Sequence, residues 1–371
     1  MRKEIRNAAI AGVIVVVAIA GIAAYFMSLD KPGASDTSVL TQSVSTNASS
    51  QDESKYPVAP DLVGIAGYVN TSPTELKDAM KNKVVLYDFW TYSCINCLRT
   101  LPYLEDWNAK YADKGLLIVG IHSPEFEFEK NIDNVRMAVQ KYNVTYPVVL
   151  DSDHATWDAF GNRYWPAEYI TDYAGHIRHV HFGEGDYDQT EKTIQTLLDQ
   201  RSKALGLGID ANTSLVDLQP HQFSDQQTPE LYFGYDFAAG RNYLGNQEGF
   251  HPNLTVSYSL PTSMQQDHFY LGGDWMNLSD SMKLSSETGK IVLPYFAKDV
   301  HIVATGPGVD VQVLLDGQPI SQNDSGLDTQ NGTAHISDNR LYNLVSSTEA
   351  GQHTLTLIAK QGFQIFTFTF G

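Results

Sequence analysis

The chain has 371 residues, of which 42% are hydrophobic, and a formal net charge of −18. This length favours two folded domains, and the hydrophobic content excludes disorder over most of the chain. The negative charge excludes nucleic acid as a partner, because phosphate binding needs a cationic surface.

The N-terminal segment has the pattern of a membrane anchor. Three basic residues among the first six precede an uninterrupted apolar run at residues 8–27. Twenty helical residues span roughly 30 Å, which matches the hydrocarbon core of a bilayer. We therefore predict that residues 1–29 form a cytoplasmic basic flank and a single transmembrane helix, with all later residues outside the cytoplasm. A cleaved signal peptide is the alternative, because the Ala-Ile-Ala at residues 18–20 resembles a cleavage site.

Residues 30–56 follow as a polar linker, and residues 57–200 alternate between strand and helix patterns. An apolar run at residues 84–90 predicts a buried strand, and a hairpin is predicted across Ala174 and Gly175. This order of elements predicts a central sheet with helices on both faces. The further strands are expected at 116–121, 147–150, 169–170 and 177–182, and the helices at 94–111, 129–142, 154–160 and 187–200.

The only two cysteines, Cys94 and Cys97, lie three positions apart at the start of a predicted helix. A disulfide between them would close a ring too small to stabilise the fold much. Thiol–disulfide exchange instead needs one thiolate that attacks and a second thiol that resolves the mixed disulfide. The helix N-terminus favours the anion on Cys94, and Cys97 lies one turn further on the same face. We therefore predict a redox-active disulfide between Cys94 and Cys97.

A zinc site is the competing interpretation of the cysteine pair. Zinc would need two further cysteine or histidine ligands at a suitable spacing. The only close pair is His179 and His181, which a strand would place on one face. Surface or packing histidines explain that pair better, so we expect neither a metal nor a cofactor.

The residues Asp88 to Tyr103, DFWTYSCINCLRTLPY, resemble thioredoxins and the TlpA-like (redoxin) domain of DipZ-type thiol–disulfide oxidoreductases. The resemblance implies a thioredoxin fold in which Asp88 lies buried beneath Cys97 and exchanges its proton. Burial would raise the pKa of such a carboxyl, which suits acid–base work. By the same resemblance, Trp90 shields the site and Pro102 kinks the helix.

Further along the chain, Trp165, Pro166 and Ala167 have the form of the family's cis-proline loop. The resemblance implies that this loop faces the cysteines and that Trp90, Trp165 and Ala167 border the substrate groove.

Three other polar residues lie near these motifs in the sequence. His122 and Glu125 follow a core strand, where they are candidates either to tune the thiolate or to cap the chain. Glu168 is a candidate to repel acidic substrates.

Residues 201–228 form a second predicted linker, and residues 229–371 change character to short β-prone runs without helices. Such spacing predicts a β-sandwich or jelly roll. The resemblance to DipZ-type proteins continues here, for example at residues 229–235 and 271–275, and implies a domain like a carbohydrate-binding module. Tyr270 and Trp275 could then stack on sugars, although core positions are commoner. The expected strands are 254–260, 268–271, 291–296, 301–304, 309–315, 353–359 and 364–370.

The sequence thus predicts a membrane-anchored oxidoreductase that exchanges disulfides with proteins outside the cytoplasm. The uncharged dipeptide Ile95-Asn96 favours the reductive direction, with electrons from a CcdA-like membrane protein, as in cytochrome c biogenesis. One alternative is a peroxiredoxin-type peroxidase; Thr91 fits that signature, whereas Tyr87 replaces its proline. The others are a copper-delivery protein and a cell-surface glycan- or protein-binding module with a vestigial redox domain.

Overall fold

The computed structural model describes residues 55–371 except 212, 222–226, 239–240 and 242. The predicted anchor at residues 1–29 and nearly all of the predicted linker at 30–56 lie outside the described residues. None of the helices within the described part has the length and hydropathy of a membrane span. The described residues from 55 onwards belong to one compact unit.

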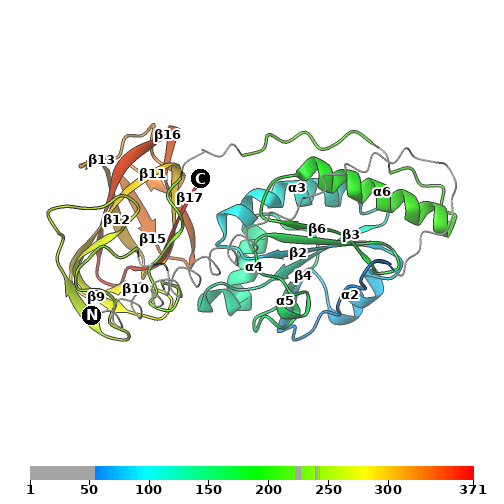
Figure 1. Cartoon of the computed structure of the whole chain (residues 1–371), viewed down its shortest axis with the longest axis horizontal. Coiled ribbons are helices and arrows are strands. Elements are labelled where there is room, and N and C mark those ends of the chain that lie inside the picture. The colour runs from blue at the N-terminus through cyan, green and yellow to red at the C-terminus, as the bar shows by residue number, and fades with distance from the viewer. Residues whose placement is uncertain (1–54, 212, 222–226, 239–240, 242) are drawn as a thin grey trace, which may run out of the picture. The chain divides into compact units, whose positions relative to one another are not determined.

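The first half of this unit contains a six-stranded sheet with the order β1-β4-β3-β2-β5-β6 (Figure 1). The central strands β2, β3 and β4 are parallel, whereas β1, β5 and β6 pair antiparallel with their neighbours. The strand bounds are β1 Gly67–Val69, β2 Val84–Trp90, β3 Leu116–His122, β4 Val148–Leu150, β5 Ala167–Thr171 and β6 Ile177–Phe182.

Side chains of the central strands alternate between two buried layers. Leu86, Trp90 and Ile170 join the cluster that contains Cys97. Tyr87 and Phe89 join the opposite cluster. This alternation follows from the two-residue period of a strand, and burial on both faces explains why every residue of β2 except Asp88 is apolar or aromatic. The helices are α2 Pro73–Ala79, α3 Ile95–Tyr111, α4 Ile132–Lys141, α5 Ala155–Ala159 and α6 Tyr187–Leu205, with a 3-10 helix at Glu127–Lys130.

The two faces of the sheet carry different helices. Residues of α3, α4 and α6 contribute to the cluster around Cys97. Residues of α2 and α5 contribute to the other cluster. The predicted arrangement of a sheet covered on both faces is therefore confirmed, and α3 packs on the face to which Leu86 and Trp90 point.

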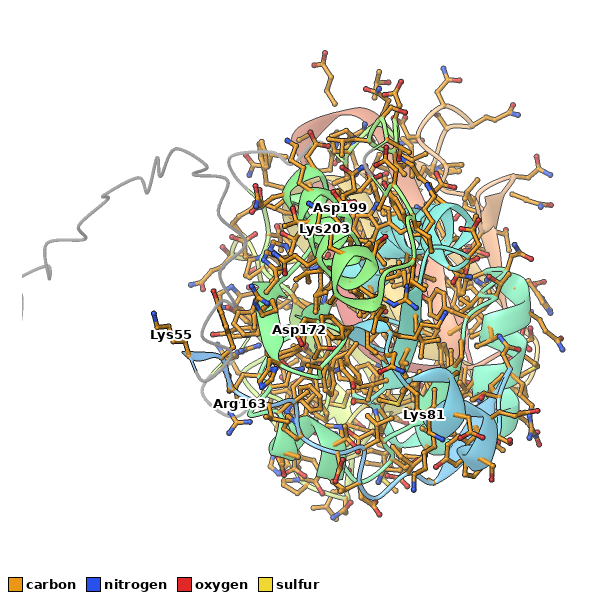
Figure 2. All side chains as sticks on the ribbon, turned by 90° about the vertical axis from the view of Figure 1, so that its right-hand side faces the viewer. Lys55, Lys81, Arg163, Asp172, Asp199 and Lys203 are labelled. Carbon is orange, nitrogen blue, oxygen red and sulfur yellow. The ribbon has the colours of Figure 1, made fainter. Side chains whose placement is uncertain are left out.

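The predicted hairpin between β5 and β6 is confirmed, and a buried acid holds its turn. The Asp172 carboxylate accepts hydrogen bonds from the backbone N–H groups of Ala174 and His176, both at 3.0 Å. It also accepts one from Arg178 Nη1 at 3.0 Å. Asp172 is labelled in Figure 2. The turn fixes the register that places Glu168 opposite His181.

Figure 2 also labels Lys55 and Arg163, whose side chains project away from the body of the molecule.

The second half of the unit is all β. In the described residues it forms an 11-stranded antiparallel sheet around its own core. Strand β11 pairs with β17 and β16 and also with β9, so that β11, β17, β10 and β9 close a ring. The strand bounds are β7 Leu231–Tyr232, β8 Thr255–Tyr258, β9 Tyr270–Asn277, β10 Met282–Leu284, β11 Thr288–Thr305, β12 Val309–Leu315, β13 Gln318–Pro319, β14 Thr329–Gln330, β15 Thr333–Ile336, β16 Arg340–Lys360 and β17 Gln364–Phe370.

Two strands of this domain are much longer than predicted. The expected strands 291–296 and 301–304 are one strand, β11, with irregular register near Ala297 and Val300. Strand β16 begins well before the predicted 353–359. Polar residues in the middle of each strand interrupt the apolar pattern, which hides the continuity from sequence reasoning.

The two aromatic residues considered for sugar stacking lie in the core. Trp275 is fully buried, and Tyr270 is 3% exposed. The Trp275 indole N–H donates to the Gly272 carbonyl at 3.2 Å. Neither ring is therefore presented to a sugar at the surface, and the core interpretation is the correct one.

Replacing Trp275 should destabilise the β domain. We expect Trp275→Ala to lower the free energy of unfolding by about 3–5 kcal/mol, because it leaves a large cavity in a close-packed core. The measurement is urea denaturation followed by far-UV circular dichroism. Leu327→Ala is the control, since Leu327 is 91% exposed in the same domain, and it should change stability by less than about 0.5 kcal/mol. A Trp275→Ala protein as stable as this control would contradict the core assignment.

Candidate active site

Cys94 and Cys97 lie at the first turn of α3 with very different exposure. Cys94 is the N-cap residue, with extended backbone, and its Sγ accepts the backbone N–H of Cys97 at 3.3 Å. Cys94 is half-buried, whereas Cys97 is 1% exposed. Burial raises the pKa of the Cys97 thiol well above its usual value, and the neighbouring Cys94 raises it further. Only Cys94 is therefore placed to meet a substrate, and Cys97 must lose a proton to react.

Asp88 lies in β2 beneath this turn, as the resemblance predicts. It is 1% exposed, and neither carboxyl oxygen has a hydrogen-bond partner among the residues described. Burial raises the pKa of Asp88 well above its usual range, and the charge of Glu168 raises it further. Asp88 also interacts electrostatically with Cys97. A carboxyl that resists ionisation therefore lies near a thiol that must ionise.

The structure rules out the candidate role of Glu168, which was to repel acidic substrates. It is 2% exposed in β5, directly opposite Asp88 in the antiparallel register. A buried side chain cannot repel an approaching acidic substrate. Burial raises the pKa of Glu168 to about 8, which the nearby Thr190 hydroxyl partly offsets. Two buried carboxyl groups, those of Asp88 and Glu168, thus lie opposite each other on β2 and β5.

The peptide bond between Trp165 and Pro166 is cis, as the resemblance predicts. The half-buried Trp165 packs against the cluster that contains both cysteines, and its indole N–H donates to the Ser123 carbonyl at 3.0 Å. Ala167 and Trp90 are both fully buried. Trp90 lies in the cluster with Cys97, whereas Ala167 lies in the cluster on the opposite face of the sheet. Of the three residues predicted to border a substrate groove, only Trp165 is therefore partly exposed.

His122 is a packing residue of the site. It is 1% exposed, stacks on Tyr92 with ring centroids 5.5 Å apart, and meets Trp90 edge-on at 5.5 Å. Burial lowers the pKa of His122 to about 3, so the ring is neutral at ordinary pH. A neutral ring offers no positive charge to a thiolate, which favours packing as the role of His122.

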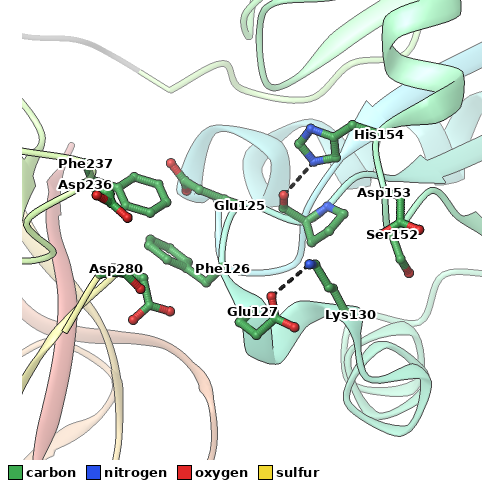
Figure 3. A pocket seen from close by; sticks show the side chains of 12 residues that line it. Glu125, Phe126, Glu127, Lys130, Ser152, Asp153, His154, Asp236, Phe237 and Asp280 are labelled. Carbon is green, nitrogen blue, oxygen red and sulfur yellow. Dashed lines mark hydrogen bonds and ion pairs between the residues drawn. The ribbon is translucent and has the colours of Figure 1, made fainter. Parts of the chain in front are cut away.

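Glu125 interacts with the β domain rather than with the cysteines. The Tyr232 hydroxyl lies 2.6 Å from a Glu125 oxygen and 2.8 Å from a Glu230 oxygen. Burial and the charge of Glu230 raise the pKa of Glu125 well above its usual value. Glu125 also lines a cavity of about 470 Å³, shown in Figure 3, to which Glu127, Asp153, Asp236 and Asp280 contribute further acids.

A buried glutamate that sequence reasoning missed holds the loop before Cys94. The Glu129 carboxylate accepts hydrogen bonds from Thr91 Oγ1 at 2.6 Å and Ser93 Oγ at 2.5 Å. It also accepts the backbone N–H groups of Glu125 at 2.6 Å and Phe126 at 2.9 Å. The two hydroxyl residues before Cys94, at positions 91 and 93, could have indicated a polar partner for this loop. The sequence does not identify that partner, because Glu129 lies 36 to 38 residues away.

The β domain contacts the helix that carries the cysteines. Phe126 of the first domain clusters with Tyr232, Val303, Leu341 and Phe366 of the β domain. Ile95 and Leu98, from the first turn of α3, pack partly buried against the same cluster. One of the two residues between the cysteines is therefore covered in part by the β domain.

Within the described residues no group of three or more potential ligands could hold a metal ion. His179 and His181 face the same side of β6, as predicted, because they pair with Ile170 and Glu168. Among the described residues no third or fourth ligand joins them, so the zinc interpretation of the cysteine pair gains no support.

Removing the Asp88 charge should stabilise the fold in a pH-dependent way. The pKa of Asp88 is about 4 in the unfolded chain and raised in the fold, so the folded state loses stability as pH rises between these values. We expect Asp88→Asn to be about 1–3 kcal/mol more stable at pH 8 and indistinguishable from wild type below pH 4.

The measurement is chemical denaturation at several pH values. Asp106→Asn, which replaces an exposed carboxyl on α3, should leave stability nearly unchanged throughout. A destabilised Asp88→Asn protein at pH 8 would contradict the description of Asp88 as an unsatisfied buried acid.

Removing Glu129 should have the opposite effect. Glu129→Ala leaves two hydroxyls and two backbone N–H groups without their acceptor, so we expect a loss of about 3 kcal/mol. The exchange of peptide N–H groups near Cys94 for deuterium should also accelerate. Slow exchange in a fully stable Glu129→Ala protein would show that the loop needs no such support.

Residues 58–180 match the AhpC/TSA family model, and residues 228–371 match the thioredoxin-like C-terminal domain model. Protein DipZ of Mycobacterium tuberculosis (strain CDC 1551 / Oshkosh) is 37% identical over 316 residues, which cover 84% of this chain and 43% of DipZ. The chain thus spans less than half of the length of DipZ. Thiol-disulfide oxidoreductase YkuV of Bacillus subtilis (strain 168) is 32% identical over 139 residues, which cover 38% of this chain and 93% of YkuV. The chain therefore belongs to the thioredoxin-like thiol–disulfide oxidoreductase family, in a two-domain form similar to DipZ.

Proposed function

We propose that this protein exchanges disulfides with other proteins through Cys94 and Cys97. One observation carries the proposal. The half-buried Cys94 caps the start of α3, and the buried Cys97, one turn further along the helix, interacts with the buried carboxyl of Asp88. Family membership supports the same conclusion. A structural disulfide at this place would stabilise little, because its ring is so small.

The exchange proceeds in two displacement steps. The Cys94 thiolate attacks a substrate disulfide, forms a mixed disulfide and releases one substrate thiolate. Cys97 then loses its proton and attacks Cys94 Sγ, which breaks the bond to the substrate and releases its second thiolate. The substrate disulfide is reduced, and the cysteine pair is oxidised by the same two electrons. Asp88, which interacts with Cys97, is the base that we assign to the second step.

We further propose that the protein works as a reductant outside the cytoplasm. The uncharged Ile95-Asn96 pair and the partial cover of Ile95 add no positive charge that would stabilise a thiolate strongly. The apolar run at residues 8–27 and its basic flank support a single-pass membrane anchor. A CcdA-like membrane protein would then supply electrons, and disulfide-containing proteins would be the clients.

The match to the AhpC/TSA family supports a second candidate, a peroxidase. Thr91 stands three residues before Cys94, as in the peroxiredoxin pattern, but Tyr87 occupies the position of its proline. In the structure Thr91 Oγ1 donates to Glu129 and is buried, so it is engaged away from a peroxide. Peroxide consumption by the reduced protein distinguishes the two activities directly.

Carbohydrate binding by the β domain stays a proposal without support from Tyr270 and Trp275, which are both buried. Glycan-array binding by the full chain would establish it. Such binding together with inert cysteines would favour the cell-surface module over the oxidoreductase.

Substitution of each cysteine should separate the two steps. With a disulfide-bonded protein such as insulin, Cys97→Ser should accumulate a mixed disulfide at Cys94, because no second thiol resolves it. Cys94→Ser should form none at a comparable rate, because Cys97 is buried. Mass spectrometry after acid quenching gives the populations. Insulin reduction by Cys94→Ser at the wild-type rate would contradict the assignment of Cys94 as nucleophile.

The direction of electron flow can be measured separately. Equilibration of the full chain with glutathione buffers gives the reduction potential of the cysteine pair. We expect a value well below that of the strong oxidant DsbA, which is about −120 mV. A potential above about −150 mV would overturn the reductive direction but not the exchange activity.

A further inference from the structure

Three titratable side chains form a row across the sheet beneath Cys97. Asp88 on β2 lies directly opposite Glu168 on β5, and Glu168 lies directly opposite His181 on β6. Directly opposite residues on neighbouring antiparallel strands share one face, with Cβ atoms about 4.5–5.5 Å apart. The row therefore runs on the face that packs against α3 and α6, from the centre of the sheet to its edge strand.

The polar atoms of this row lack the partners that buried polar groups ordinarily have. Both oxygens of Asp88, Oε2 of Glu168 and Nε2 of His181 are buried without a hydrogen-bond partner in the described part of the chain. Asp88 and Glu168 are almost completely enclosed, whereas His181 is half-buried. In a network whose role is to stabilise the fold, these atoms would form hydrogen bonds with one another. In this row the atoms have no such partners, and the row leads from the centre of the sheet to its edge strand.

Other titratable groups surround the row on every packed element. Next to Asp88 on β3 lies Gly120, which offers no side chain. Tyr146 and Tyr187 both interact with Glu168, and burial raises the pKa of each. Cys97 on α3 interacts electrostatically with Asp88, and His179 on β6 interacts with His181. Further charged groups lie one step away: Glu105 on α3 interacts with Tyr146, Glu184 before α6 interacts with Tyr187, and Asp186 interacts with His179.

We propose that Asp88, Glu168 and His181 form a proton path between Cys97 and solvent. The inference rests on the proposed exchange activity and adds Glu168 and His181 to it as positioning and relay residues. When Cys97 attacks Cys94 Sγ, the S–H bond breaks and the new S–S bond forms, while the substrate thiolate leaves with the electron pair of the old S–S bond. The Cys97 proton passes to Asp88, then to Glu168, and through His181 to water.

Glu168 matters because Asp88 alone would have to keep the proton. Asp88 is sealed beneath Cys97, so a proton that it accepts must leave before the next cycle. Its immediate neighbour across β5 is a second carboxyl whose pKa is also raised, to about 8. Burial raises the pKa of both carboxyls, so either one can hold the proton. Glu168 therefore allows Asp88 to release its proton and return to the ionised form without exposure of Asp88 to solvent.

The chain offers a matched control within the same strands. Leu86, Ile170 and His179 form the neighbouring row on the same face, because Leu86 pairs with Ile170 and Ile170 pairs with His179. His179 and His181 thus share a strand and a face, but only His181 lies opposite a carboxyl. His181→Gln removes a ring opposite a carboxyl, whereas His179→Gln removes a ring opposite Ile170.

The test uses the reduced full chain and the small disulfide 5,5′-dithiobis(2-nitrobenzoate) in stopped flow. The first thionitrobenzoate released reports attack by Cys94, and the second reports resolution by Cys97. In Glu168→Gln we expect the second phase to slow roughly tenfold at neutral pH, with the first phase unchanged. The pH midpoint of the second phase should also fall, because the carboxyl that raises the pKa of Asp88 is gone. A residue that only supported the fold would leave that midpoint in place, and one that only raised the pKa of Asp88 would shift the midpoint without slowing the second phase above it.

His181→Gln should slow the second phase, and added imidazole should restore it, whereas His179→Gln should match wild type. A second phase in Glu168→Gln with the wild-type rate and midpoint would overturn the path. Equal rates of the second phase in His179→Gln and His181→Gln would also overturn the proton path. This comparison of the two histidine variants is the deciding one if Glu168→Gln does not fold. If wild type itself releases no second thionitrobenzoate, the proposed exchange activity fails instead.

Discussion

Burial of ionisable groups under the first turn of α3 is the constraint on which the rest of the site depends. A thiol and two carboxyl groups, Cys97, Asp88 and Glu168, occupy the same enclosed face of the sheet. Burial makes it costly to charge any one of them. The charge of Glu168 also raises the pKa of Asp88, and the charge of Asp88 raises the pKa of Cys97, so their protonation states depend on one another. The chain accepts this cost at the centre of an otherwise apolar sheet, which points to chemistry rather than stability.

The fold meets this constraint by placing rigid elements around the cysteines. A four-residue loop connects the end of β2 at Trp90 to the start of α3 at Ile95, and its last residue, Cys94, caps the helix. Glu129 ties the connecting loop through Thr91 and Ser93, and the β domain covers Ile95 in part. Cys94 is therefore held at the surface by groups that come from three separate segments of the chain.

Local patterns in the sequence predicted the parts of the site that lie close together along the chain. The strand with Asp88 and the helix that begins after Cys94 follow from local patterns, whereas the cis-proline loop at Pro166 was implied by the family resemblance; the structure contains all three. Glu129 could not be found in this way, because the two hydroxyls that connect it to the loop before Cys94 lie more than 35 residues away. Glu168 was misjudged because its burial depends on the register between β2 and β5 rather than on its neighbours in sequence. The length of β11 was missed for a similar reason, since pairing with β16 and β17 overrides its interrupted apolar pattern.

The central claim is that both cysteines act together in one two-electron exchange. It is tested most directly by mixing the reduced full chain with a disulfide-bonded protein and counting thiols on both partners by alkylation and mass spectrometry. The account predicts that each chain loses both free thiols and gains a Cys94–Cys97 disulfide for every substrate disulfide reduced. Substrate reduction that leaves Cys97 fully alkylatable would contradict it.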